Sequence, residues 1–233
     1  MISRERAQAL SSRGLAITVL GLAALTTVYV KAFMFTPVER VQGPAQKIFY
    51  VHVPAAWAGL MAFIFTGVLS ILYLWLRDRR LDAAAASSAE AGVVFSTVMM
   101  TTGPIWGKTV WGTWWTWDAR LTFTLLLFMM FVGYLMMRSA VADHDMRARF
   151  SAVFGVLGLV LVPFVHMTVY WFRTLHPQPV VLKPTGPTLP GTMLTTLLMS
   201  VAAFTVLYLG FVTTRYGVMG LEDARQRELH DDA

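Results

Sequence analysis

One stretch of the chain, residues 106–122 (WGKTVWGTWWTWDARLT), gathers aromatic side chains beside one acidic and two basic residues. It holds five of the eight tryptophans of the protein: Trp106, Trp111, Trp114, Trp115 and Trp117. If the stretch is helical, the spacing i, i+3, i+4 and i+7 places three indoles and one carboxylate on one face: Trp111, Trp114, Trp115 and Asp118. Such a face would suit a large, flat, apolar ligand. The alternative is an interfacial belt, because tryptophan favours the headgroup level of a membrane.

Two histidines flank this stretch in the sequence, His52 in YVHVPAAW and His176 in TLHP. We expect Pro54 in the first turn of a helix, where its missing N–H is no loss, so that His52 stands at the mouth of a membrane span. A histidine that only caps a helix start is the alternative for His52. His166 lies inside an apolar run and needs a polar partner there. His176 is the stronger candidate ligand, because it is nearer to the tryptophans.

The composition indicates a polytopic membrane protein. The 233 residues are 56% hydrophobic and only 14% charged, with a mean hydropathy of +0.59. Apolar runs of roughly 20 residues are long enough to cross the hydrocarbon as helices. We predict an all-α bundle of six transmembrane helices, a single domain over residues 1–233 with an outer tryptophan-rich segment at residues 103–121. The predicted spans are residues 14–35, 52–76, 83–102, 121–141, 150–172 and 191–213.

Basic residues predict the orientation of the six spans. Twelve lysines and arginines fall on the side of the two termini and seven on the opposite side. Because positive charge is enriched in cytoplasmic loops, we expect both termini in the cytoplasm and the tryptophans outside. The first apolar run is too long for a secretory signal and should remain as a span. The net charge of +6 then reflects topology and anionic lipid, and no nucleic acid partner is expected.

The residue types fit haem better than other cofactors. Iron takes axial histidine nitrogens, the macrocycle has a broad apolar face, and the propionates seek cations. His52 and His176 are the candidate axial pair. Asp118 is expected to orient a histidine or to hold Arg120. The candidate propionate partners are basic residues near the tryptophans and the histidines: Lys47, Lys108, Arg120 and Arg173.

Other kinds of site find less support in the sequence. Because the chain has no cysteine, disulfides, thiolate metal sites and thiol catalysis are excluded. A structural zinc site would need four closely spaced ligands, and no serine or threonine has the spacing of a catalytic triad. Nothing resembles a phosphate-binding glycine loop, so an ATP-driven step must come from another chain. A transporter with a midplane site is disfavoured, because the polar chemistry gathers at one face.

Three motifs together resemble the CcmC family of haem-handling membrane proteins in cytochrome c maturation. They are WGTWWTWDARLT at residues 111–122, YVHVPAAW at residues 50–57 and TLHP at residues 174–177. The resemblance implies that His52 and His176 ligate haem b. It implies an outer haem platform formed by Trp111, Trp114, Trp115, Trp117 and Asp118. It also implies docking of the haem chaperone CcmE and association with the ATP-binding cassette subunits CcmA and CcmB and with the small protein CcmD.

We therefore expect a protein that holds haem and presents it to the chaperone, without making bonds itself. The alternative is a structural or docking subunit of an ABC-type membrane complex that has no haem site of its own. Retention of haem on purification would distinguish these two functions.

Overall fold

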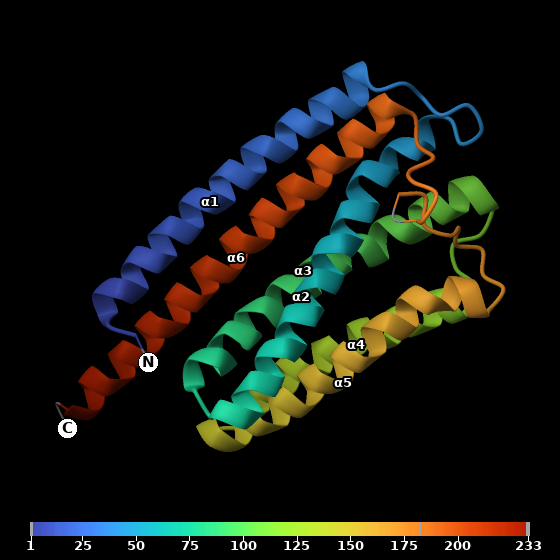
Figure 1. The fold of residues 1–233 in the computed structure, drawn as a ribbon. Helices are drawn as coiled ribbons and strands as arrows, with labels where there is room; N and C mark the ends of the chain where they lie inside the picture. Colours follow the sequence, from blue (N-terminus) through green and yellow to red (C-terminus); the bar gives the residue numbers. More distant parts are fainter. Residues whose placement is uncertain (1, 182, 232–233) are drawn as a thin grey trace.

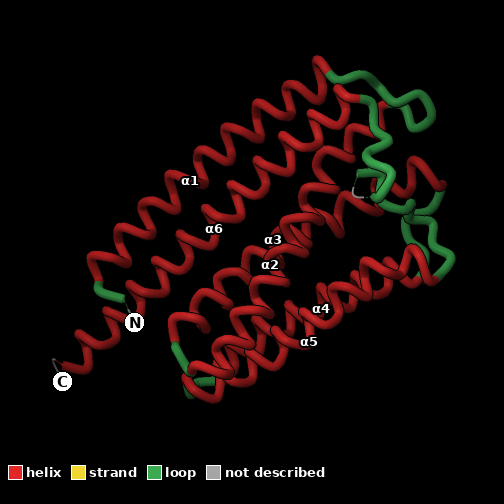
Figure 2. Tube along the Cα trace, in the orientation of Figure 1, coloured by secondary structure: helices red, strands yellow, loops and turns green. Residues whose placement is uncertain are grey.

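Six long helices form the protein, and Figures 1 and 2 show them in the computed structural model, which describes residues 2–181 and 183–231. They are α1 (Arg4–Val30), α2 (Phe49–Leu76), α3 (Arg79–Trp111), α4 (Ala119–Ala140), α5 (His144–Trp171) and α6 (Gly191–Asp231). A π-helical turn, η1 (Lys31–Phe35), continues α1, and a 3-10 helix, η2 (Pro44–Ile48), leads into α2. All six are long and apolar enough to span a membrane, and the described residues form no β-strand. The predicted all-α bundle of six membrane helices is confirmed.

The helices are arranged as three pairs. α1 lies along α6, α4 lies along α5, and α2 with α3 lies between these two pairs (Figure 1). α1 begins and α6 ends at the same end of the bundle as the turns at residues 77–78 and 141–143. The opposite end, which we call the loop end, gathers the connections at residues 36–43, 112–118 and 172–190, of which residue 182 is not described. The tryptophan-rich stretch and His176 therefore lie away from both chain termini.

The helices are longer than the predicted spans, because capped polar turns extend them beyond the apolar runs. Asp78, Asp118 and Asp143 precede α3, α4 and α5 and accept a backbone N–H of the first turn at 2.9, 3.1 and 2.7 Å. Such N-caps stabilise a helix start by about 1 kcal/mol. At its other end α3 continues past residue 102 to Trp111. Hydropathy thus locates the part of each helix that crosses hydrocarbon and misses the polar ends.

Glycines bring α1 and α6 into close contact. Gly14 and Gly21 on α1 face α6, and Gly210 and Gly217 on α6 face α1. A Cβ at Gly21 would lie 2.8 Å from Cγ of Leu207, nearer than side chains approach. In lipid, where burial of apolar groups gives little driving force, such close backbone packing holds helices together. α6 is therefore fixed against α1.

Ion pairs join the helices at the end that carries the chain termini. Asp82 on α3 accepts two hydrogen bonds from Arg138 on α4, at 2.6 and 3.0 Å. These two side chains are only 16% and 11% exposed. Glu90 on α3 accepts from Arg215 on α6 at 2.7 Å. α3 is thus tied to both α4 and α6 on this side of the bundle.

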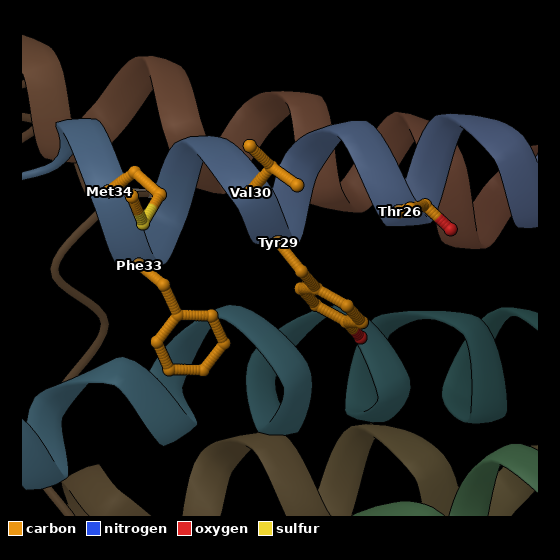
Figure 3. Close-up of a pocket in the computed structure, with 5 residues that line it drawn as sticks. All are labelled: Thr26, Tyr29, Val30, Phe33 and Met34. Carbon is orange, nitrogen blue, oxygen red and sulfur yellow. The ribbon is translucent and has the colours of Figure 1, made fainter.

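An open apolar groove runs along the loop-end half of α1 (Figure 3). Tyr29 of α1 and Phe33 of η1 extend toward α2, and Thr26, Val30 and Met34 complete the lining. The lining contains no histidine, carboxylate or amine. The groove therefore offers a contact surface for lipid chains rather than a chemical site.

Candidate functional site

The tryptophan-rich stretch is not one helix. α3 carries Trp106 and Trp111 and ends there, because Gly112 takes a left-handed conformation with φ 77°. The Gly112 N–H donates to the Lys108 carbonyl at 3.2 Å, and the Lys108 ammonium donates to the Gly112 carbonyl at 3.0 Å. Residues 112–118 are irregular up to the N-cap of α4. The condition for a shared face from Trp111 to Asp118, a single helix, is therefore not met, since a glycine C-cap and an aspartate N-cap interrupt the stretch.

Three indoles of this stretch are nevertheless exposed. Trp111, Trp114 and Trp117 are 39%, 59% and 76% exposed. Trp115 is half-buried and meets Trp117 edge-on, with ring centroids 5.8 Å apart at 77°. Its Nε1 is buried and finds no acceptor among the described residues. The stretch thus offers an exposed aromatic surface and one unused indole N–H donor.

Asp118 joins the tryptophan-rich stretch to the loop that carries His176. One carboxylate oxygen accepts the N–H of Leu121 and caps α4. The other accepts the hydroxyl of Thr116 at 3.0 Å and the backbone N–H of Leu175 at 3.4 Å. Because Leu175 directly precedes His176, this carboxylate holds the histidine loop through its backbone.

His176 lies half-buried in the loop after α5, with its Nδ1 3.0 Å from the carbonyl oxygen of Pro177. A carbonyl only accepts hydrogen bonds, so Nδ1 carries the proton and Nε2 keeps its lone pair. Burial, followed by the positive charge of Arg120, lowers the pKa of His176 to about 4. The imidazole is therefore neutral at neutral pH, which is the state that binds a metal.

Charged and titratable residues from separate elements converge on His176. Its pKa also responds to His52 on α2 and to Asp118 at the start of α4. Arg120, the second residue of α4, is partly buried and donates a long hydrogen bond of 3.4 Å to the Val165 carbonyl on α5. No carboxylate of the described chain forms an ion pair with Arg120. The pKa of His176 thus responds to both His52 and Arg120, which indicates that the two candidate histidines lie in one region of the loop end with a guanidinium that has no ion-pair partner among the described residues.

His52 lies on α2 against the end of α3. Its Nδ1 is 3.0 Å from Oγ1 of Thr102, and its ring meets the edge of Trp106 with 5.7 Å between centroids. Trp106 in turn donates its indole N–H to Gln42 at 3.0 Å. Trp106 therefore packs the histidine instead of joining the exposed surface. Sequence reasoning missed Thr102, because threonine is common in membrane helices, and its i, i+4 spacing to Trp106 is the only signal.

The start of α2 differs from the prediction. The sequence predicts Pro54 in the first turn, but α2 begins at Phe49 and Pro54 lies inside it. A proline has no N–H to donate to the carbonyl four residues earlier, which here belongs to Tyr50. Ser200 of α6 donates to this carbonyl at 2.6 Å instead. The bond from α6 therefore satisfies the group that Pro54 leaves free and fixes the turn that carries His52.

Lys47 has a structural role in place of the predicted contact with a propionate. Its side chain is buried, and the ammonium donates to the carbonyls of Ala32, Thr36 and Pro37. All three of its protons are thereby used. The charge also lies at the C-terminal end of α1 and η1, where the helix dipole favours a cation. Lys47 therefore leaves the candidate site, because no donor remains for an acidic ligand.

The remaining candidates lie at the edge of the site. Lys108 caps α3, as described above. Arg173 and His166 are exposed side chains, the first directly after α5 and the second on it. No hydrogen bond among the described residues directs either of them to His52 or His176.

Comparisons relate the chain to haem exporter proteins. A family model described as "Heme exporter protein C" (CcmC) matches residues 2–230. Heme exporter protein C of Bradyrhizobium diazoefficiens is 35% identical over 210 residues, 88% of this chain and 79% of that protein. Its namesake in Haemophilus influenzae is 32% identical over 193 residues, 83% of this chain and 78% of that protein. A ccmC-like mitochondrial protein of Marchantia polymorpha, named for cytochrome c biosynthesis, is 34% identical over 168 residues, 72% of this chain and 71% of that protein. The chain therefore belongs to the CcmC family of haem exporter proteins.

Proposed function

We propose that this chain binds haem b as cargo between His52 and His176 and presents it to the haem chaperone CcmE during cytochrome c maturation. Membership of a haem exporter family supports a role in haem handling. The observation that carries the proposal is the convergence of two histidines, from α2 and from the loop after α5, beside Arg120. Two imidazoles and one free cation match the iron and the propionates of one macrocycle.

The residues present fit haem in three further ways. The buried Nε1 of Trp115 lacks an acceptor among the described residues and suits a propionate oxygen. The exposed rings of Trp111, Trp114 and Trp117 can cover a flat apolar surface. Asp118 keeps these tryptophans in contact with the histidine loop. The side chains at the loop end therefore suit a ligand that has a metal, a broad apolar face and an acidic edge.

In this proposal the side chains of the protein hold, orient and expose the cargo. Haem iron supplies two positions that accept imidazole nitrogens. His52 and His176 hold the iron through Nε2, and Arg120 with the Trp115 N–H satisfies the propionates. The site lies at the loop end of the bundle, where a chaperone can approach it. We assign no bond-making step to this chain.

The proposed topology has both termini in the cytoplasm of a bacterial inner membrane and the loop end outside. The excess of basic residues on the side of the termini supports this orientation. We propose residues 103–121 as the haem-handling segment of one domain over residues 1–233, of which residues 1, 182, 232 and 233 lie outside the described part. Trp114 and Trp117 are the proposed docking surface for CcmE, and CcmA, CcmB and CcmD are the proposed partners in the membrane.

The visible absorption spectrum of the detergent-purified protein, oxidised and reduced, tests the proposal. We expect a sharp Soret band with low-spin features, lost or shifted in His52→Ala and in His176→Ala, because each variant lacks one ligand. His144→Ala is the matched control, since His144 is exposed at the opposite end of the bundle. An unchanged spectrum in both ligand variants would contradict the axial pair.

A second candidate function is that of a docking subunit without its own haem site. The exposure of Trp114 and Trp117 favours it, since tryptophan is enriched in protein interfaces. Such a protein would purify colourless, would take up no added haemin and would still assemble with CcmA and CcmB.

A further inference from the structure

The imidazole of His52 is held by the last turns of α3. Its Nδ1 is 3.0 Å from Oγ1 of Thr102. A Cβ at Gly103 would lie 3.0 Å from Cε1 of His52, so the missing side chain makes room for the ring. Trp106 packs its edge against the same ring. The position of the imidazole is therefore set by three neighbours on one helix, and Thr102 is the neighbour whose side chain bonds to it.

The direction of the bond between His52 and Thr102 follows from the other contact of the hydroxyl. Thr102 Oγ1 is 2.7 Å from the carbonyl oxygen of Val98. That carbonyl only accepts, and a hydroxyl has one proton, so the proton of Thr102 points to Val98. With its proton donated to Val98, the hydroxyl accepts from Nδ1 of His52. A neutral imidazole has one N–H, so Nε2 of His52 keeps its lone pair.

We propose that Thr102 is a positioning residue that fixes the Nδ1–H tautomer and the orientation of His52, so that Nε2 is presented to the iron of the cargo. The proposal rests on the proposed function. A hydrogen bond to the non-coordinating nitrogen fixes the ring of a ligand histidine and raises its basicity, and its loss costs about 10–100-fold in metal affinity.

The Nδ1–H groups of the two histidines have different kinds of acceptor. His176 donates to the backbone carbonyl of Pro177, which no substitution of a side chain removes. His52 donates to a side chain on another helix, which can be removed without changing the backbone. Thr102 therefore allows the orientation of one ligand to be tested while the other ligand is left intact.

Three variants isolate the effect of the Thr102 hydroxyl. Thr102→Val has the same shape without the acceptor, and Thr102→Ser keeps the hydroxyl. Thr101→Val is the matched control, because Thr101 makes the same type of bond to the carbonyl of Thr97 (2.8 Å) but is exposed and does not contact His52. In haemin titrations we expect Thr102→Val to bind about 10–100-fold more weakly than wild type. Thr102→Ser and Thr101→Val should bind like wild type.

A second measurement reads the tautomer in the haem-free protein. Nitrogen NMR of protein labelled with ¹⁵N-histidine, compared with His52→Gln for assignment, should show a protonated Nδ1 and an unprotonated Nε2 for His52. Thr102→Val should show a mixture of both tautomers. A purely structural effect of the substitution would lower thermal stability and leave the tautomer unchanged. If Thr102→Val does not fold, Thr102→Ala removes the same hydroxyl and is read in the same way.

The outcomes separate this proposal from the proposed function. If His52→Ala leaves the haem spectrum unchanged, the haem site itself is wrong. If His52→Ala abolishes the spectrum while Thr102→Val matches Thr101→Val in affinity and in tautomer, the haem site stands and the role of Thr102 is overturned.

Discussion

The backbone N–H of Leu175 donates to the carboxylate of Asp118, and this bond links the tryptophan-rich stretch to the loop of His176. The same carboxylate caps α4, so one side chain serves both a helix start and a contact between two connections. The two partners are far apart in the sequence. The carboxylate of Asp118 therefore connects the part of the loop end that carries the indoles to the part that carries His176.

Replacement of Asp118 by alanine is expected to weaken both features. Loss of an N-cap costs about 0.5–2 kcal/mol, and the histidine loop loses its contact with the tryptophans. We expect a lower melting temperature in detergent and weaker binding in haemin titrations. Asp118→Asn keeps the capping oxygen for Leu121, but its amide nitrogen cannot accept the N–H of Leu175, so we expect near-normal stability and weakened haemin binding. Wild-type haemin affinity in Asp118→Asn would show that the bond to Leu175 does not contribute to binding.

Arg120→Ala is expected to weaken haem binding by roughly 10–100-fold, because a hydrogen bond with a charged partner contributes about 1.5–3 kcal/mol. Haemin dimethyl ester is the control ligand, since its esterified propionates carry no charge. If Arg120 binds a propionate, wild type and variant should bind the ester equally well. A variant that prefers the free acid over the ester as strongly as wild type does would exclude this contact.

Lys47→Met should destabilise the loop end without changing the iron ligands. The variant leaves the carbonyls of Ala32, Thr36 and Pro37 without their donor. An unsatisfied buried polar group costs about 1–3 kcal/mol. The melting temperature should fall, while the Soret maximum and the haemin affinity of the folded fraction stay at wild-type values. A normal melting temperature with reduced haemin affinity would show that Lys47 contributes to haem binding.

Arg138→Ala is expected to destabilise the opposite end of the bundle, because it leaves the carboxylate of Asp82 without its partner. Breaking a buried pair in this way costs about 3–5 kcal/mol, and the remaining solvent contact of Asp82 places the loss toward the lower value. Arg138→Ala combined with Asp82→Ala should recover part of the stability. Unfolding in mixed detergent and SDS micelles measures both variants. Equal stability of the single and double variants would show that the two side chains are not coupled.

The six spans can be predicted from the sequence because each depends on a local run of apolar residues. The ends of the helices cannot, since they depend on caps that hydropathy does not register. Gly112 ends α3 after Trp111, and Asp118 caps α4, so the tryptophan pattern that resembles a helix is divided between α3 and an irregular connection. Glycine and aspartate at these positions are cap signals, and the indole spacing obscures them.

Contacts between distant segments explain the other differences. Lys47 looks like a free cation in the sequence, but η2 packs it against the end of α1, where three carbonyls receive it. Pro54 looks like a helix start, but Ser200 on α6 satisfies the carbonyl that the proline leaves free. Thr102 has only its spacing to Trp106 as a signal, because its partner His52 lies on another helix. Which helices face each other is a property of the folded bundle and has no local pattern.

The hydrogen bond from Ser200 to the Tyr50 carbonyl has a mechanical consequence for the spacing of the two imidazoles. α6 begins at Gly191, where the connection that carries His176 ends, and Ser200 of α6 is attached to α2 two residues before His52. α6 therefore holds the turn of His52 directly, while Asp118 at the start of α4 holds the loop of His176. A tilt of α6 would carry the His52 turn with it and change the gap between the two rings, and the glycine contacts with α1 restrain that tilt.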